Sequence, residues 1–126
     1  MEFTAVIPII RILSAQQAKE FYLDFLGFTL DWEHRFCEDS PLYAQITRAS
    51  VTLHLSENPE DGIPGSMILL PAHDINALYR ELSAKKGRFT LPGIQTLKWG
   101  KELNFADPFD NRLRFCQQIG DFCATD

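Results

Sequence analysis

The sequence predicts an α+β fold made of two βαβββ modules, at about residues 1–58 and 64–119 of a single 126-residue domain. Two helical patterns each follow one extended segment and precede three more. A loop rich in proline and glycine, residues 57–65, separates the two halves. The shared order of elements indicates an internal duplication. Each module leaves one sheet face uncovered, so we expect the paired sheets to curve around a cleft, where ligands bind.

The first half begins with a predicted strand over residues 3–12, in which Pro8 removes a backbone donor and favours a short or edge strand. Ser14 and Gln17 form a capping box that starts a helix. Gly27 ends this helix with a left-handed cap. Helical spacing predicts one buried face, made by Ala18, Phe21, Tyr22, Phe25 and Leu26. Three further strands are expected at residues 28–36, 42–47 and 51–56.

The second half repeats this order, starting with a buried strand at residues 66–70. Asp74 caps a second helix that Gly87 ends. The inner face of this helix is predicted to be Ile75, Leu78, Tyr79 and Leu82. The remaining strands are expected at residues 94–97, 101–106 and 111–117, before a frayed tail at 121–126.

The last two strands form a hairpin whose turn contains Pro108, which pre-sets the turn, and Asn111, which tolerates a left-handed backbone. Period-two alternation gives each strand one apolar and one polar face. The apolar face holds Leu103, Phe105, Leu113 and Phe115. The polar face points into a cleft or water and holds Glu102, Asn104, Arg112 and Arg114.

The composition excludes several classes of partner. A net charge of −5 argues against nucleic acid, because phosphate binding needs clustered Lys and Arg. The acidic balance favours solubility, or a cationic small molecule. No apolar run approaches the ~20 residues of a membrane span, and the N-terminal residues lack a secretion signal. Three cysteines without metal-like spacing, Cys37, Cys116 and Cys123, indicate free thiols in a reducing cytoplasm.

Four stretches, residues 8–12, 18–28, 53–57 and 99–115, give the chain a resemblance to the vicinal oxygen chelate superfamily. That group includes glyoxalase I, ring-cleaving dioxygenases and bleomycin-resistance proteins. The Trp99-Gly100-x-Glu102 motif before the Asp-Pro turn is most similar to the bleomycin-resistance branch. Asp110 departs from the glycine that relatives usually carry before Asn. The resemblance implies a homodimer in which a second subunit completes the cleft.

Enzymes of this superfamily hold a divalent ion at four strand positions, and the resemblance maps these positions onto the present chain. They fall on Ile7, near His54, on Met67 or Ile68, and on Arg114. A metal site needs several deprotonated N or O ligands, and an arginine repels the ion. Only His54 survives as a ligand. We therefore predict no metal, no cofactor and no catalytic residues.

The predicted ligand-binding residues are Trp32, Phe36, His54, Trp99, Glu102 and Arg114. Aromatic rings at similar places in bleomycin-resistance relatives stack on a flat, cationic drug, and Asp31, Glu33 and Glu102 offer opposite charge. Alternation puts Trp32, His34 and Phe36 on one face and Asp31, Glu33 and Arg35 on the other.

Each of these residues also has a purely structural interpretation. Trp32 and Phe36 are cleft walls, or else core or dimer contacts. His54 either bonds a ligand or lies within a polar network. Glu102 and Arg114 are expected to form a cross-strand ion pair.

These observations predict a metal-independent protein that binds and sequesters a small aromatic or cationic molecule in a dimer cleft, as bleomycin-resistance proteins do. The first alternative is a metal-dependent glyoxalase-like lyase or dioxygenase. The number of metal-ligating side chains distinguishes this alternative from a binding protein. The second alternative is a divergent scaffold whose cleft binds an unknown metabolite.

Overall fold

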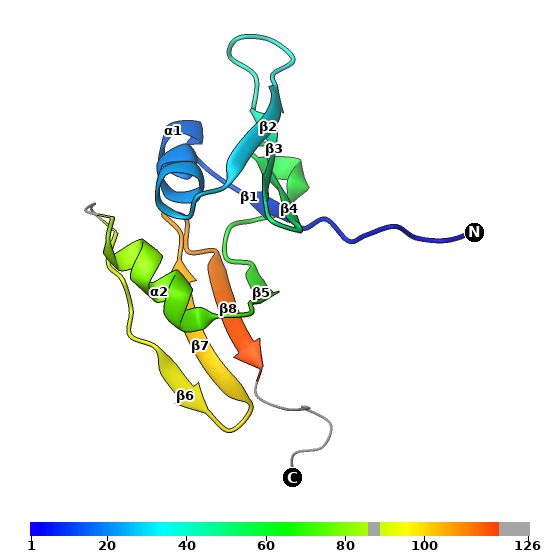
Figure 1. Cartoon of the computed structure of the whole chain (residues 1–126). Helices are drawn as coiled ribbons and strands as arrows, with labels where there is room; N and C mark the ends of the chain where they lie inside the picture. Colours follow the sequence, from blue (N-terminus) through cyan, green and yellow to red (C-terminus); the bar gives the residue numbers. More distant parts are fainter. Residues whose placement is uncertain (86–88, 119–126) are drawn as a thin grey trace. The chain divides into compact units, whose positions relative to one another are not determined.

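The computed structural model describes residues 1–85 and 89–118, and the chain divides into two compact units. Unit 1 is Met1–Ser66 together with Pro108–Asn111, and unit 2 is Met67–Asp107 with the chain from Arg112 onward. Each unit contains one four-stranded sheet with helix beside it (Figure 1). The α+β class and the strand-helix-strand-strand-strand order of each half are thereby confirmed.

Unit 1 forms a mixed sheet in the order β1-β4-β3-β2. Its strands are β1 (Ile9–Arg11), β2 (Thr29–His34), β3 (Tyr43–Arg48) and β4 (Val51–Ser56). β1 pairs in parallel with β4, and the other neighbours are antiparallel. β1 is three residues long and lies at the sheet edge, as Pro8 indicates. A 3₁₀ turn, η2 (Pro59–Asp61), follows β4.

The helix of unit 1 begins as predicted and then widens. The Ser14 side chain accepts a hydrogen bond from the Gln17 backbone at the start of α1 (Ala15–Lys19). The helix continues as wider π-helical turns in η1 (Glu20–Phe25), which the sequence pattern did not predict. Gly27 has a φ of 78°, which confirms the left-handed cap. All five residues of the predicted apolar face are buried: Ala18, Phe21, Tyr22, Phe25 and Leu26.

Unit 2 repeats the sheet in the order β5-β8-β7-β6, again with its first and last strands parallel. The strands are β5 (Met67–Pro71), β6 (Gln95–Leu97), β7 (Gly100–Ala106) and β8 (Arg112–Gln118). The helix α2 (Ile75–Ser83) packs against β7 and β8, with Asp74 capping its start (Figure 1). The side chains of Ile75 and Leu82, both in α2, are buried. The predicted helix end at Gly87 and the predicted tail at 121–126 lie outside the described residues.

The prediction that β5 is buried is wrong. Met67 and Leu69 are 54% and 53% exposed, because β5 is an edge strand with one face uncovered in the described chain. Alternate residues of the neighbouring strands, Leu103, Phe105 and Leu113, form the buried face instead.

Asp110 and Asn111 have different roles in the turn between β7 and β8. Asp110, and not Asn111, adopts the left-handed backbone, with a φ of 66°. Asn111 is fully buried. Its Oδ1 accepts from the backbone of Gly65 and Ser66 at 2.8 and 3.0 Å, and its Nδ2 donates to the carbonyl of Arg11 at 2.9 Å. Asn111 therefore links the segment at Gly65 and Ser66, which joins the two halves of the sequence, to Arg11 in β1.

Candidate functional site

The open face of unit 1, defined here as the side chains of Ile9, Asp31, Trp32, Tyr43, Gln45, Thr47 and His54, carries an aromatic cluster. The opposite face holds the buried residues Ala44, Ile46, Leu53 and Leu55. Trp32 stacks on Tyr43 with ring centroids 6.1 Å apart and an interplanar angle of 15°. His54 presents its ring edge-on to both, at centroid distances of 5.4 and 5.1 Å. Trp32 remains 44% exposed, so its ring is available to a ligand.

A chain of hydrogen bonds holds this cluster in place. The Tyr43 hydroxyl lies 2.7 Å from Nδ1 of His54, and Nε2 of His54 lies 3.0 Å from Oε1 of Gln45. Gln45 Nε2 then donates to Asp31 at 3.1 Å. Because the Gln45 oxygen only accepts, Nε2 of His54 donates to it, and in a neutral imidazole Nδ1 then accepts from the Tyr43 hydroxyl. Both ring nitrogens are thus engaged, which places His54 in the polar network considered as one of its two interpretations.

Tyr43 is kept in the form that donates to His54. Burial, and secondly the negative charge of Asp61, raise the pKa of Tyr43 above its ordinary value of 10.0. The phenol therefore stays protonated at neutral pH and provides the donor that orients His54.

A β-bulge in β2 changes which residues share this face. Register shifts between Leu30 and Trp32, so Asp31 lies beside Trp32 and accepts from Gln45 and Thr47. The predicted strict alternation, which puts Asp31 on the opposite face, is wrong for this reason. Glu33 does lie elsewhere, paired with Lys19 at 2.7 Å.

Phe36 lies beyond the end of β2 and is not part of the Trp32 cluster. Its side chain is 88% exposed and its ring contacts His34, with centroids 6.4 Å apart. The interpretation of Trp32 and Phe36 as core residues is therefore wrong for the described chain.

Unit 2 brings Trp99, Glu102 and Arg114 together. Glu102 is only 4% exposed, although the alternation predicted a side chain facing a cleft or water. Trp99 Nε1 donates to Glu102 Oε2 at 2.8 Å, and Arg114 Nε lies 3.7 Å from Glu102 Oε1. The predicted cross-strand pair of Glu102 and Arg114 is confirmed, and Trp99 covers the carboxylate from the preceding turn.

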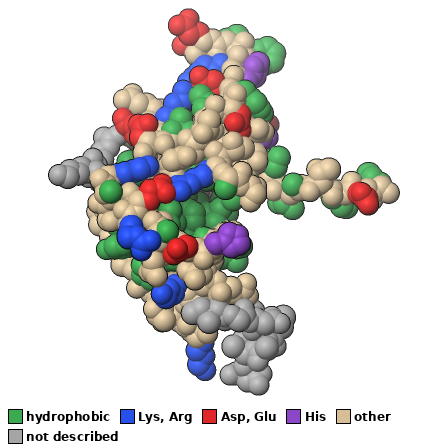
Figure 2. Space-filling model, viewed as in Figure 1, with side chains coloured by type: hydrophobic (Ala, Val, Ile, Leu, Met, Phe, Trp, Pro, Cys, Tyr) green, Lys and Arg blue, Asp and Glu red, His purple; other side chains and the backbone are tan. Residues whose placement is uncertain are grey.

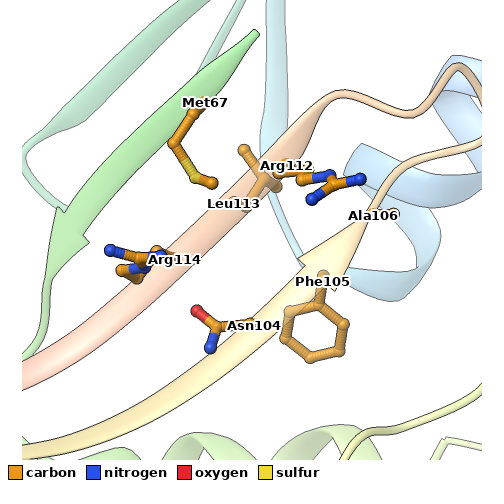
Figure 3. Close-up of a pocket in the computed structure, with 7 residues that line it drawn as sticks. All are labelled: Met67, Asn104, Phe105, Ala106, Arg112, Leu113 and Arg114. Atoms are coloured by element: carbon orange, nitrogen blue, oxygen red, sulfur yellow. The ribbon is translucent and has the colours of Figure 1, made fainter. Parts of the chain in front are cut away.

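A hollow of about 240 Å³ lies beside this pair, on the open face of the unit 2 sheet. Its seven lining residues come from β5, β7 and β8: Met67, Asn104, Phe105, Ala106, Arg112, Leu113 and Arg114 (Figure 3). Two guanidinium groups from β8 flank it, and the Asn104 side chain rises from β7 on the side of Arg114 (Figure 3). The charged side chains that line the hollow are thus both arginines, in a protein of net charge −5.

The four positions at which the superfamily's enzymes bind metal do not make a ligand set here. The residue paired with His54 is Ile9, two positions beyond the predicted Ile7. Ile68 pairs with Leu113 on the buried face, so the β5 position falls on Met67 or Leu69, next to Arg112 or Arg114. In the part of the chain that the structure describes, no group of three or more His, Cys, Asp and Glu side chains is placed to hold a metal ion.

Tyr43 and Gln45 of the unit 1 network were not among the predicted ligand-binding residues, and Asp31 was predicted only as a source of negative charge. Of the seven residues that line the hollow, only Arg114 was predicted to bind a ligand. Alternation in β3 was an available signal, because Tyr43, Gln45 and Thr47 alternate with the apolar Ala44 and Ile46. The bulge that adds Asp31 has no comparable signal in the sequence.

Comparisons with known proteins agree with this architecture. The model of a family described as glyoxalase superfamily protein matches residues 1–121. No curated protein matches the chain by sequence. Within residues 1–85 and 89–118, no helix is long and apolar enough to cross a membrane.

Several solved structures share the fold. TnmS3, an antibiotic-binding protein from Streptomyces sp. CB03234, is 23% identical with a TM-score of 0.74, over 94% of this chain and 99% of its own. The bleomycin-binding protein of Streptomyces verticillus, solved with copper(II)-bleomycin, is 20% identical with a TM-score of 0.69, over 94% and 99%. The bleomycin resistance determinant of transposon Tn5 is 16% identical with a TM-score of 0.69, over 94% and 100%. The family match across nearly the whole sequence establishes that the chain belongs to the glyoxalase superfamily.

Proposed function

We propose that the protein binds a small molecule with a flat aromatic portion on the open face of unit 1 and sequesters it without chemical change. The observation that carries the proposal is the exposed ring of Trp32, stacked on Tyr43 and held by the network through His54. An aromatic side chain that is already fixed loses little conformational freedom when a ligand stacks on it. Solved structures that share this fold include an antibiotic-binding protein and bleomycin-binding proteins, and this similarity supports the proposal.

The charge of the same face supports a cationic ligand. Asp31 lies beside Trp32 and accepts two hydrogen bonds, from Gln45 and Thr47, which fix its carboxylate near the ring. A cation placed over the indole is attracted by the ring quadrupole and by this carboxylate.

Metal independence is part of the proposal and rests on the residues at the superfamily's ligand positions. Coordination by His54 requires breaking its contact with Tyr43 or with Gln45. The positions that would complete the site hold Ile9, Met67 or Leu69, and Arg114. A guanidinium repels a divalent ion, and the aliphatic side chains have no donor atom.

We further propose that the protein acts in the cytoplasm as a homodimer. Free Cys37 and Cys116 support a reducing compartment. The N-terminal segment extends away from the strands of unit 1 (Figures 1 and 2), where Phe3 and Val6 are almost completely exposed. Large apolar side chains in such a setting are typical of an interface with another chain. Light scattering coupled to gel filtration tests the dimer, and a monomeric mass at micromolar concentration would contradict it.

Titration calorimetry with metal-free bleomycin, in buffer containing a chelator, tests the binding function. We expect saturable heat at fixed stoichiometry and recovery of the drug unchanged. Trp32→Ala should weaken binding by about tenfold, since aromatic contacts contribute on the order of 1 kcal/mol beyond their buried area. Ile63→Ala is the control, because it removes an even more exposed apolar side chain (81% against 44% for Trp32) from a loop outside the face.

Two results would contradict the proposal. One is bleomycin binding that Trp32→Ala leaves unchanged. The other is steady turnover of the hemithioacetal of methylglyoxal and glutathione that stops with a chelator and returns with nickel or zinc, which would instead identify a glyoxalase-like lyase.

A further inference from the structure

We propose that the hollow of unit 2 binds an oxyanion, a carboxylate or phosphate, on a small molecule that also carries a hydroxyl or amine beside it. The site lies within β5, β7 and β8 of unit 2. It goes beyond the aromatic ligand proposed for unit 1, and it stands whether or not that ligand binds.

The strand register shapes the hollow. Arg112 pairs with Met67 on β5 and with Ala106 on β7, while Arg114 pairs with Leu69 and Asn104. Both arginines therefore project from the same face of β8, two residues apart. The small side chain of Ala106 leaves room beside the guanidinium groups, and Met67 closes the β5 side (Figure 3).

The charge of the hollow suits an anion. The guanidinium groups of Arg112 and Arg114 both line it, and Glu102 Oε1 lies 3.7 Å from the Nε of Arg114. The Arg114 side chain is 44% exposed. The two terminal nitrogens of a guanidinium form a planar fork that matches the two oxygens of a carboxylate or phosphate. Because the whole chain is acidic, a generally basic surface does not account for this arrangement.

Asn104 supplies a second and independent observation. Its Nδ2 lies 3.5 Å from Glu102 Oε1 and 3.5 Å from Gln95 Oε1, so the amide nitrogen faces two acceptors. Its Oδ1 is buried and has no hydrogen-bond partner in the structure. A rotated amide would place this oxygen against the Glu102 carboxylate, which disfavours the exchange. Leaving a buried acceptor unpaired costs free energy. A ligand that carries a hydroxyl or amine next to its anionic group would donate a hydrogen bond to this oxygen.

Trp99 offers an optical reporter for this site. Its indole donates to Glu102, and Glu102 contacts Arg114, so anion binding changes the surroundings of the indole. The chain has two tryptophans, and Trp32→Phe leaves Trp99 as the single one. We would titrate Trp32→Phe with acetate, glycolate (acetate bearing a hydroxyl) and inorganic phosphate at constant ionic strength in chloride, following Trp99 fluorescence and, independently, calorimetric heat.

We expect saturable binding of glycolate that is several-fold tighter than that of acetate. Arg114→Gln should weaken binding by about tenfold, because it removes the fork. Arg80→Gln, the matched control, makes the same charge change at an exposed position on α2 and should have no effect. Asn104→Leu should remove the advantage of glycolate over acetate and leave acetate binding in place. Tighter binding of phosphate than of glycolate would assign the anion to a phosphate ester, and the reverse order to a hydroxy or amino acid.

Three results would overturn the inference: no saturable change with any of the three anions, equal weakening by Arg114→Gln and Arg80→Gln, or a glycolate advantage that survives Asn104→Leu. Failure of the unit 1 proposal is distinguishable from these results. It would appear as lost bleomycin binding in protein whose Trp99 still responds to anions.

Discussion

The two sheets share one design and differ in what their open faces carry. In unit 1 the register aligns Ile9, His54 and Gln45 across three strands, and in unit 2 it aligns Leu69, Arg114 and Asn104. Each row holds an exposed aliphatic residue on the first strand and an amide on the third. The two rows differ at the last strand of each half, which holds the imidazole of His54 in unit 1 and the permanent cation of Arg114 in unit 2.

This difference decides what each amide can do. The Gln45 oxygen accepts from His54, so the unit 1 row is satisfied within the protein and its function is to hold the aromatic rings in place. The Asn104 oxygen has no hydrogen-bond partner, so the unit 2 row leaves one buried acceptor unsatisfied. Equivalent strand positions therefore give an aromatic surface whose polar groups are paired in unit 1, and a row with an unpaired acceptor in unit 2.

Asn111 gives the largest expected effect, because it tests whether unit 1 depends on residues from the later part of the sequence. Asn111→Ala removes hydrogen bonds to Gly65, Ser66 and Arg11 and leaves buried backbone groups unpaired. We expect a loss of about 4 kcal/mol in the free energy of unfolding, measured by urea denaturation. Asn76→Ala, on the exposed side of α2, is the control. A loss below about 1 kcal/mol for Asn111→Ala would show that unit 1 folds without needing these hydrogen bonds.

Gly100 provides the corresponding test in unit 2. It has a φ of 155°, and a Cβ there would lie 2.1 Å from the carbonyl oxygen of Gln117 on the paired strand. Gly100→Ala should destabilise the protein by about 3 kcal/mol, since backbone on both strands must shift. Gly93→Ala has open space around the added methyl and should change stability by less than about 1 kcal/mol. Similar losses of stability for the two substitutions would show that the backbones of β7 and β8 move apart at little cost in free energy.

Local patterns predicted the buried half of each unit well. Both helix starts, at Ser14 and Asp74, and the left-handed Gly27 follow from short-range chemistry that is independent of the rest of the fold. The open faces were predicted less well. Alternation fails at the Asp31 bulge, because a bulge arises from how two strands pair and not from either strand alone.

The candidate site shows the same limit. The sequence predicted Trp32, His54, Trp99, Glu102 and Arg114 as ligand-binding residues, which stays a prediction. The structure places the first two in a cluster of unit 1 and the other three in a cluster of unit 2. Phe36 was predicted to share a face with Trp32 because side chains alternate along a strand. However, β2 ends at His34, so this alternation does not extend to Phe36. The partners of His54, and the unpaired oxygen of Asn104, depend on cross-strand geometry that no spacing along the chain encodes.

The stability of the protein at alkaline pH tests whether the Tyr43 hydroxyl donates to His54 in the unit 1 network. The folded state raises the pKa of Tyr43 above 10.0, so it favours the protonated phenol. This contribution is complete below the unfolded pKa and is lost as pH rises through the folded pKa. Tyr43→Phe should lower stability at pH 7 by about 1 kcal/mol, by removing the bond to His54, and the difference from the native protein should shrink above pH 10. Urea denaturation at pH 7, 9 and 11 measures it, and a difference that grows with pH would contradict the assigned donor role.

The smallest expected effect compares the last hairpin of each half, where a residue other than glycine adopts the left-handed backbone. These are Ala49 in the β3–β4 turn, with φ 54°, and Asp110 in the β7–β8 turn, with φ 66°. A short polar side chain tolerates this conformation because it bonds to nearby backbone, whereas a methyl group gains nothing there. Ala49→Gly should therefore raise the free energy of unfolding by up to about 1 kcal/mol, and Asp110→Gly should gain less, since the strain removed is smaller and its interactions are lost. A larger gain from Asp110→Gly would show that the second turn is the more strained, and that its aspartate stays in place for a reason other than local stability.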